Sequence, residues 1–185
     1  MESVIINFFG GPGIGKSTQA TGLFTEMKKN HMDVELTYEF PKIVAWEENL
    51  SAVKDQFYIT ANQHRNISRL YGKVKYIIVD SPIILGCFYK NRYGNPTDYP
   101  GSYYDNTFDE FIWGLFKKYN NLNIVLKRDD SSFDANGRFQ NLQESKEIDD
   151  DITNTLTNNN IPYIEFSVNN DTPLEIYKYL KENNI

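Results

Sequence analysis

The stretch of sequence that decides the fold is Gly10-Gly11-Pro12-Gly13-Ile14-Gly15-Lys16-Ser17-Thr18. It matches the pattern G-x-x-x-x-G-K-[ST], with Gly10 and Gly15 at the two fixed glycine positions. The apolar run Val4–Phe9 precedes the pattern and a helix-prone run follows it, which is the strand–loop–helix arrangement that the pattern requires. The sequence therefore predicts a phosphate-binding loop, or P-loop.

The residues of this loop have separate expected tasks. Glycines allow consecutive backbone N–H groups to turn inward around the β-phosphate, and the following helix directs its positive N-terminal end at the same anion. Lys16 is expected to span the β- and γ-phosphates, the Ser17 hydroxyl to ligate Mg²⁺, and Thr18 to contact the α-phosphate. The predicted nucleotide-binding residues are Gly11, Gly13, Ile14, Gly15, Lys16, Ser17 and Thr18.

The remainder of the chain alternates between short apolar runs and longer amphipathic stretches, which is typical of an α/β protein with a parallel sheet. The expected strands are Ser3–Phe9, Asp33–Tyr38, Val74–Asp80, Leu122–Lys127 and Tyr163–Ser167. The expected helices are Lys16–Asn30, Ser51–Tyr71, Asp105–Lys118, Leu142–Leu156 and Pro173–Lys181. No repeat or linker divides the 185 residues, so we expect one domain over residues 1–185.

The composition excludes several classes of protein. A hydrophobic share of 40% and an aromatic share of 15% supply a core and exclude wholesale disorder. The net charge of −6 argues against a protein that coats nucleic acid. The single Cys87 forms no internal disulfide and Val4–Phe9 is too short for a membrane span, so we expect a cytoplasmic protein. Abundant Asn and Tyr with little Ala suit an AT-rich genome such as a phage's, whose protein would work in the host cytoplasm.

A second acidic element follows the third expected strand. Tyr76-Ile77-Ile78-Val79 is apolar and ends in Asp80, which we predict to ligate Mg²⁺ directly or through water. Asp is also a common turn residue, so this interpretation depends on the P-loop. Switch GTPases need a base-reading motif Asn-Lys-x-Asp, which the sequence lacks, and a D-x-x-G at the second acidic strand, where Asp80 is instead followed by Ser81-Pro82-Ile83. AAA+ motors and helicases need a longer chain. A compact kinase is the class that remains.

The chain resembles the P-loop kinases that group deoxynucleoside kinases with the ribosylnicotinamide-kinase type, including small phage-encoded members. In deoxynucleoside kinases the second strand ends in a Glu that is followed by Pro and then Trp. Here Glu39 is followed by Pro41 and Trp46, with one residue inserted between Glu and Pro. The resemblance implies that Glu39 takes the proton of the acceptor hydroxyl and that Trp46 contacts the acceptor. It also implies a three-layer P-loop NTPase fold, whose five-stranded parallel sheet has the order 2-3-1-4-5 with right-handed crossovers.

The next helix of that family presents a Gln to the substrate base, which corresponds to Gln63. Arg65 and Arg69 share a helix face and are candidates for holding a phosphate, although a solvated helix face explains them equally well. The family places an acidic-Arg-Ser triplet after its third strand, whereas this chain has Asp80-Ser81-Pro82. His64 is expected to be structural or exposed rather than catalytic.

Two polar segments have functional interpretations. Residues 91–104 carry two Pro and two Gly without an apolar period, and we predict a loop or flap. Related kinases carry arginines in a lid for the transferring phosphoryl group, and Arg128 and Arg138 flank a turn-rich segment in an expected lid over 128–140. Both arginines are therefore predicted to be catalytic. The acidic run Glu144–Asp151 is expected to be a solvated helix face.

Three functional hypotheses stay open at this point. The leading one is an ATP- and Mg²⁺-dependent kinase acting on a nucleoside, a nucleotide or a related riboside. The second is a phage-type kinase that modifies DNA by phosphorylating 5-hydroxymethyluracil, which requires a basic channel for the strand. The third is a nucleotide-binding regulatory module with little turnover. The oligomeric state is open, with a homodimer among the options, and no membrane partner is expected.

Overall fold

The centre of the fold is a five-stranded sheet in the order β2-β3-β1-β4-β5. The computed structural model describes residues 2–48, 52, 55–93, 106–128 and 142–185. The strands are β1 (Val4–Phe9), β2 (Val34–Thr37), β3 (Tyr76–Val79), β4 (Asn120–Lys127) and β5 (Ile164–Ser167). Every neighbouring pair is parallel. The predicted fold class and strand order are confirmed.

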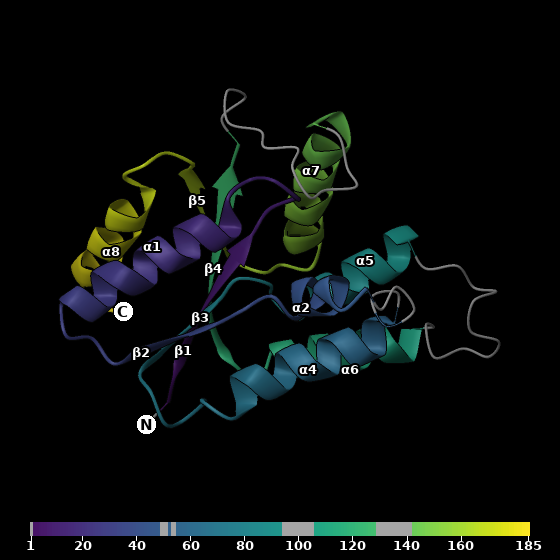
Figure 1. Cartoon of the computed structure of the whole chain (residues 1–185), viewed down its shortest axis with the longest axis horizontal. Helices are drawn as coiled ribbons and strands as arrows, with labels where there is room; N and C mark the ends of the chain where they lie inside the picture. Colours follow the sequence, from purple (N-terminus) through teal and green to yellow (C-terminus); the bar gives the residue numbers. More distant parts are fainter. Residues whose placement is uncertain (1, 49–51, 53–54, 94–105, 129–141) are drawn as a thin grey trace.

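Helices cover both faces of the sheet (Figure 1). The described helices are α1 (Lys16–Lys29), α2 (Phe40–Trp46), α4 (Gln56–Ser68), α5 (Leu85–Tyr93), α6 (Asn106–Phe116), α7 (Leu142–Asn158) and α8 (Thr172–Glu182). Figure 1 shows α1 and α8 together on one side of the sheet, with α4, α5, α6 and α7 on the other. Within the described residues, every helix is too short or too polar to cross a membrane.

The three central strands β3, β1 and β4 contain continuous buried runs, whereas the edge strands β2 and β5 are buried only in part. Along β1, Ile6 and Phe8 pack toward α1 and α8, whereas Ile5 and Phe9 pack toward the opposite helices. Each fully buried apolar side chain of this size contributes about 1.5–3 kcal/mol. The sheet is therefore a rigid support for the loops that follow its strands.

A buried set of asparagine amides links β1 to β4. Asn7 Nδ2 donates to Asn121 Oδ1 at 2.9 Å and to Asn123 Oδ1 at 3.0 Å. Asn123 Nδ2 in turn donates to the Pro162 carbonyl at 2.9 Å, in the connection to β5. A slip of one residue would turn these amides into the opposite apolar face, so the set favours the observed register.

Two helices are not predicted from the sequence. α2 is only seven residues long, and α5 begins apolar and ends polar, so neither has a clear helical period. The predicted flap over 91–104 is wrong for its first residues, because Asn91–Tyr93 end α5; residues 94–105 lie outside the described part. The described helix α4 begins at Gln56 rather than Ser51, where the Asp55 side chain accepts a hydrogen bond from the Tyr58 N–H at 2.9 Å.

Candidate functional site

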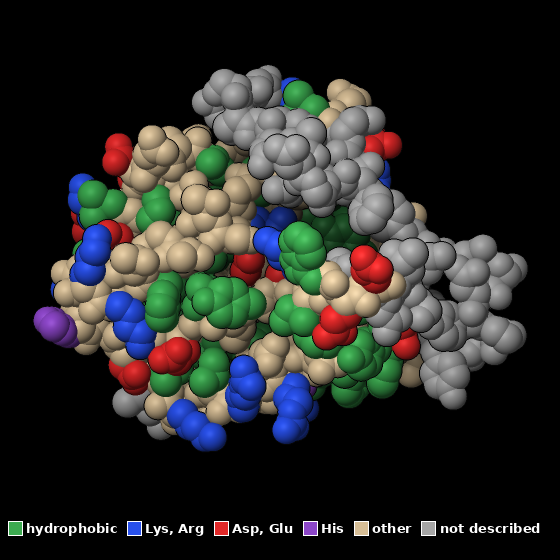
Figure 2. Space-filling model, viewed as in Figure 1, with side chains coloured by type: hydrophobic (Ala, Val, Ile, Leu, Met, Phe, Trp, Pro, Cys, Tyr) green, Lys and Arg blue, Asp and Glu red, His purple; other side chains and the backbone are tan. Residues whose placement is uncertain are grey.

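A cavity lies at the carboxyl edge of the parallel sheet, where three strand ends meet. The P-loop follows β1, Glu39 lies two residues after β2, and Asp80 follows β3 directly. Open parallel sheets bind their ligands at this edge. The cavity measures about 190 Å³ and is lined by Ser17, Ala20, Thr21, Leu36, Tyr38, Glu39, Lys42 and Asp80. Figure 2 shows charged side chains of both signs gathered in a hollow near the centre of the view, bordered by hydrophobic side chains.

The P-loop has the backbone that its glycines predict. Gly15 is the N-cap of α1 with φ of 96°, a left-handed conformation that a side chain would strain. Ile14 is buried in the core on the α1 side and anchors the loop to the sheet. Lys16 Nζ donates to the Gly10 carbonyl at 2.7 Å and to the Gly11 carbonyl at 3.0 Å. The ammonium group is thus held by the rim of the loop.

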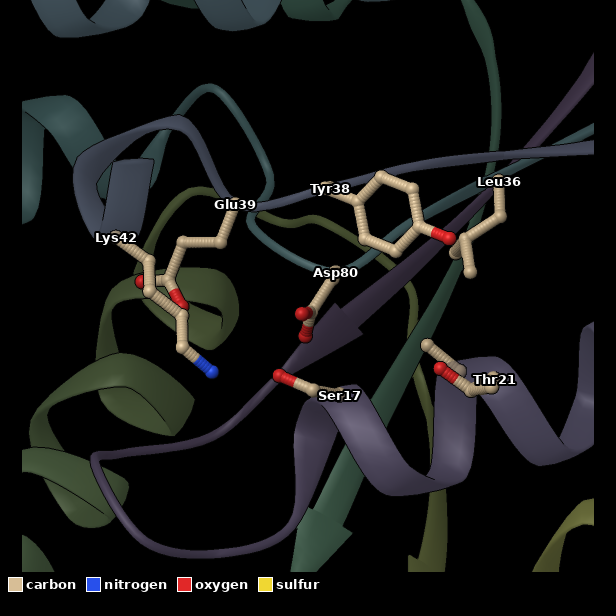
Figure 3. Close-up of a pocket in the computed structure, with 8 residues that line it drawn as sticks. Ser17, Thr21, Leu36, Tyr38, Glu39, Lys42 and Asp80 are labelled. Atoms are coloured by element: carbon tan, nitrogen blue, oxygen red, sulfur yellow. The ribbon is translucent and has the colours of Figure 1, made fainter. Parts of the chain in front are cut away.

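Asp80 and Ser17 face one another across the cavity, as Figure 3 shows. Asp80 is 4% exposed, and its Oδ1 has no hydrogen-bond partner among the described residues. A buried carboxylate oxygen opposite a hydroxyl suits a hard cation such as Mg²⁺. The described residues contain no cluster of three His, Cys, Asp or Glu that could hold a metal ion.

Glu39 and Lys42 enter the cavity from its other side, where β2 leads into α2 (Figure 3). The two residues lie three positions apart, which brings both to the same side of a helical turn. Tyr38 lines the cavity beside them and is 71% exposed. Lys42 is a residue of the site that was not predicted from the sequence; the signal for it is its spacing of three residues from Glu39.

Arg128 bonds to the P-loop and to α7 and is not among the residues that line the cavity. Its Nε donates to Asp149 Oδ2 at 2.9 Å, and its Nη2 donates to the Pro12 carbonyl at 3.0 Å. Asp149 belongs to the acidic run that was expected to be a solvated helix face, and this expectation is wrong for Asp149 itself. Its Oδ1 accepts a hydrogen bond from the Gly11 N–H at 2.5 Å. The predicted lid residue Arg138 lies outside the described residues.

The residues predicted to contact the acceptor are not among those that line the cavity in the described part of the chain. Gln63 is buried and its Nε2 donates to Ser81 Oγ at 2.8 Å, which ties α4 to the turn that follows Asp80. Trp46 is 80% exposed at the end of α2. Arg65 and Arg69 are exposed on α4 and at its C-cap, and their role as acceptor ligands stays a prediction.

His64 is tied to the framework rather than to the cavity. Its Nε2 lies 2.8 Å from the Tyr119 hydroxyl, and the two rings pack with centroids 6.0 Å apart. Burial lowers the pKa of His64 and raises that of Tyr119. This arrangement agrees with the expectation of a structural histidine.

Comparison with known proteins identifies the family. Residues 5–171 match the AAA_28 family, described as an AAA domain. The chain belongs to this family of AAA domains. The length of the chain had argued against an AAA+ motor. The family match concerns the domain and does not test motor activity. A search of the curated proteins finds no match to this sequence.

Solved structures share the fold of this AAA domain. The NadR protein in complex with NR superposes with a TM-score of 0.70 at 12% identity, over 97% of this chain and 50% of that one. This chain therefore spans half the length of the NadR chain. Deoxyadenosine kinase from M. mycoides with bound dATP gives a TM-score of 0.59 at 20% identity, over 98% and 100%. The same kinase with bound dCTP gives a TM-score of 0.57 at 18% identity, over 98% of this chain and 100% of that one. The predicted resemblance is confirmed at the level of the fold.

Proposed function

We propose that this chain is an ATP- and Mg²⁺-dependent kinase that transfers a γ-phosphoryl group to a nucleoside, a nucleotide or a related riboside. One observation carries the proposal: a single cavity joins Ser17 of the P-loop helix with Asp80 and Glu39. Phosphoryl transfer depends mainly on positioning and electrostatics, so this juxtaposition is what such an enzyme needs. The fold likeness to deoxyadenosine kinase and NadR supports the class of acceptor.

The donor half of the reaction belongs to the P-loop. Lys16 rests on two neutral carbonyl oxygens, and a bound triphosphate would attract its ammonium group more strongly than these carbonyls do. Ser17 and Asp80 would hold Mg²⁺, with the carboxylate acting directly or through water. When bound, the ion neutralises negative charge on the phosphate oxygens.

The acceptor half belongs to the segment between β2 and α2. Glu39 accepts the proton of the acceptor hydroxyl while the acceptor oxygen bonds to the γ-phosphorus. The bond between the γ-phosphorus and the bridging oxygen breaks at the same time, and ADP carries the electron pair away. Lys42 supplies positive charge on the same side of the cavity. Arg138 stays a prediction for the lid.

The test is ADP release from Mg²⁺–ATP with a panel of free nucleosides, nucleotides and DNA containing 5-hydroxymethyluracil. We expect ADP formation above the acceptor-free rate with a nucleoside, a nucleotide or a riboside, and none from Lys16→Ala. Turnover with the modified DNA alone would replace the proposal with the DNA-kinase alternative. Tight ATP binding without turnover on any acceptor would indicate the regulatory module.

A further inference from the structure

The P-loop is held from behind by a pair of charged residues that belong to distant parts of the chain. Asp149 on α7 uses both carboxylate oxygens, Oδ1 accepting from the Gly11 N–H at 2.5 Å and Oδ2 from Arg128 Nε at 2.9 Å. Arg128, just after β4, also donates to the Pro12 carbonyl at 3.0 Å. The pair is secluded from solvent, since the side chains of Arg128 and Asp149 are 5% and 17% exposed.

Close packing of α7 on the loop supports the same contact. A Cβ at Gly11 would lie 2.7 Å from Asp149 Oδ1 and 2.7 Å from the Ser145 carbonyl. One of these neighbours is backbone, so it cannot rotate away. The second residue of the motif must therefore be glycine for α7 to reach the loop.

The contact with Asp149 bears directly on Lys16. The peptide between Gly10 and Gly11 is trans, so its N–H and C=O point in opposite directions. The N–H of this peptide donates to Asp149, and its carbonyl accepts from Lys16 Nζ at 2.7 Å. Orienting this one peptide therefore orients the group that holds the P-loop lysine.

The charge of Arg128 has a second consequence. A lone carboxylate beside the P-loop would repel a bound phosphate, whereas a paired carboxylate is largely neutralised. Arg128 thus allows Asp149 to hold the Gly11 N–H without placing net negative charge at the phosphate site.

We propose that Asp149 and Arg128 are positioning residues of the phosphate site, which hold the peptide behind Lys16 and cancel each other's charge. The inference rests on the proposed function to the extent that the P-loop must bind a nucleotide. It does not depend on the identity of the acceptor.

The first experiment measures binding of a fluorescent ATP analogue with Mg²⁺ to the full chain. Asp149→Asn keeps the shape but turns an NH₂ group toward a donor, either Arg128 or the Gly11 N–H, and we expect binding weaker by on the order of tenfold. Asp150→Asn is the matched control, because it removes the same charge from the next residue of α7, which is exposed. We expect it to bind as the wild type does. Equal binding by the two variants would overturn the proposal, and a wild type that binds no nucleotide would overturn the proposed function instead.

The second experiment separates positioning from direct catalysis by Arg128. Arg128→Met leaves the Asp149 carboxylate uncompensated beside the phosphate site, and the double variant with Asp149→Asn removes that charge. We expect the double variant to bind the analogue several-fold better than Arg128→Met alone. An Arg128 that acted on the transferring phosphoryl group would instead lower kcat at unchanged nucleotide affinity, without rescue, and that result would overturn the proposal.

Thermal unfolding of each variant checks that the variant is folded. Arg128→Lys keeps the positive charge but loses the two-pronged geometry, so we expect its nucleotide affinity to lie between those of the wild type and Arg128→Met. If Asp149→Asn does not fold, the series of Arg128 variants still decides the matter. Wild-type affinity in all of the folded Arg128 variants would overturn the proposal.

Discussion

The two sides of the cavity are built in opposite ways. On the donor side, the P-loop backbone is bonded to Lys16, Asp149 and Arg128, and the last two side chains are secluded from solvent. On the acceptor side, Tyr38 is 71% exposed and α2 is a helix of only seven residues. The donor side is therefore held by bonds within the protein, whereas the acceptor side presents an exposed aromatic side chain next to a short helix.

This difference corresponds to the two demands of phosphoryl transfer. The triphosphate is always the same, so a preorganised site that costs little reorganisation serves it best. An acceptor varies between enzymes, and exposed residues on a short segment can change without disturbing a core. Changes on the donor side should therefore affect nucleotide binding, whereas the effects of changes on the acceptor side should depend on the acceptor.

Lys16→Ala should have the largest effect on turnover, and a small effect would contradict the difference drawn between the donor and acceptor sides. We expect turnover to be abolished, because the γ-phosphate loses a cation that is already positioned by the loop. The free energy of unfolding should change little, since Lys16 is only partly buried and bonds to the loop rim. Steady-state kinetics and thermal unfolding check the two parts, and a near-normal rate would contradict the P-loop assignment.

Glu39→Gln tests the acceptor side. Glutamine keeps the reach of the side chain but cannot accept the acceptor's proton, so we expect kcat to fall by about 10²–10⁴-fold. Affinity for ATP should barely change, because Glu39 lies across the cavity from the P-loop. Single-turnover rates with acceptor present, together with ATP binding, measure this separation.

Asp80→Asn is the control from the donor side. It should weaken Mg²⁺-dependent ATP binding by on the order of tenfold as well as lowering turnover, because the buried carboxylate that suits the ion is lost. If Asp80→Asn harmed only the chemical step while Glu39→Gln harmed metal binding, the two roles would be exchanged. Small and equal effects would favour the regulatory module.

Lys42→Met sharpens the comparison on the acceptor side. The cavity loses a cation beside Glu39, and we expect kcat/KM for the acceptor to fall by roughly tenfold to a hundredfold. A loss in kcat would indicate contact with the transferring group, whereas a loss in KM would indicate contact with the acceptor. Lys73→Met is the control, because Lys73 is an exposed residue ahead of β3, at the opposite edge of the sheet. Equal rates in both variants would remove Lys42 from the mechanism.

The smallest effect concerns the support of α4 behind the acceptor side. Burial lowers the pKa of His64, so the unfolded chain binds this proton more readily than the folded chain does. The contribution of His64 to the free energy of unfolding is therefore complete above the ordinary pKa of about 6.5. This contribution is lost as the pH falls from there toward the lower pKa of the folded state. We expect the midpoint of thermal unfolding to fall more between pH 7.5 and 5.5 in the wild type than in His64→Gln. Parallel curves for the two proteins would show that His64 titrates normally.

The donor side of the site was predictable from the sequence because its chemistry is local. A P-loop works through consecutive backbone N–H groups and the helix that follows them, so nine contiguous residues, Gly10–Thr18, carry both the fold signal and the phosphate-binding residues. Asp80 and Glu39 were also predictable from the sequence. Parallel strands end at one edge of the sheet, which brings together the residues that follow them.

The tertiary structure alone decided which of the remaining polar residues serve the site. Gly11 and Asp149 are 138 positions apart, and a carboxylate in an acidic helical run has the same sequence pattern whether it faces water or a loop. Arg128 was identifiable as a flanking arginine, but its direction depends on how α7 packs against the P-loop. Periodicity reports which face of an element is apolar, whereas the partner of a single polar group is set by contacts between elements that are distant in the chain.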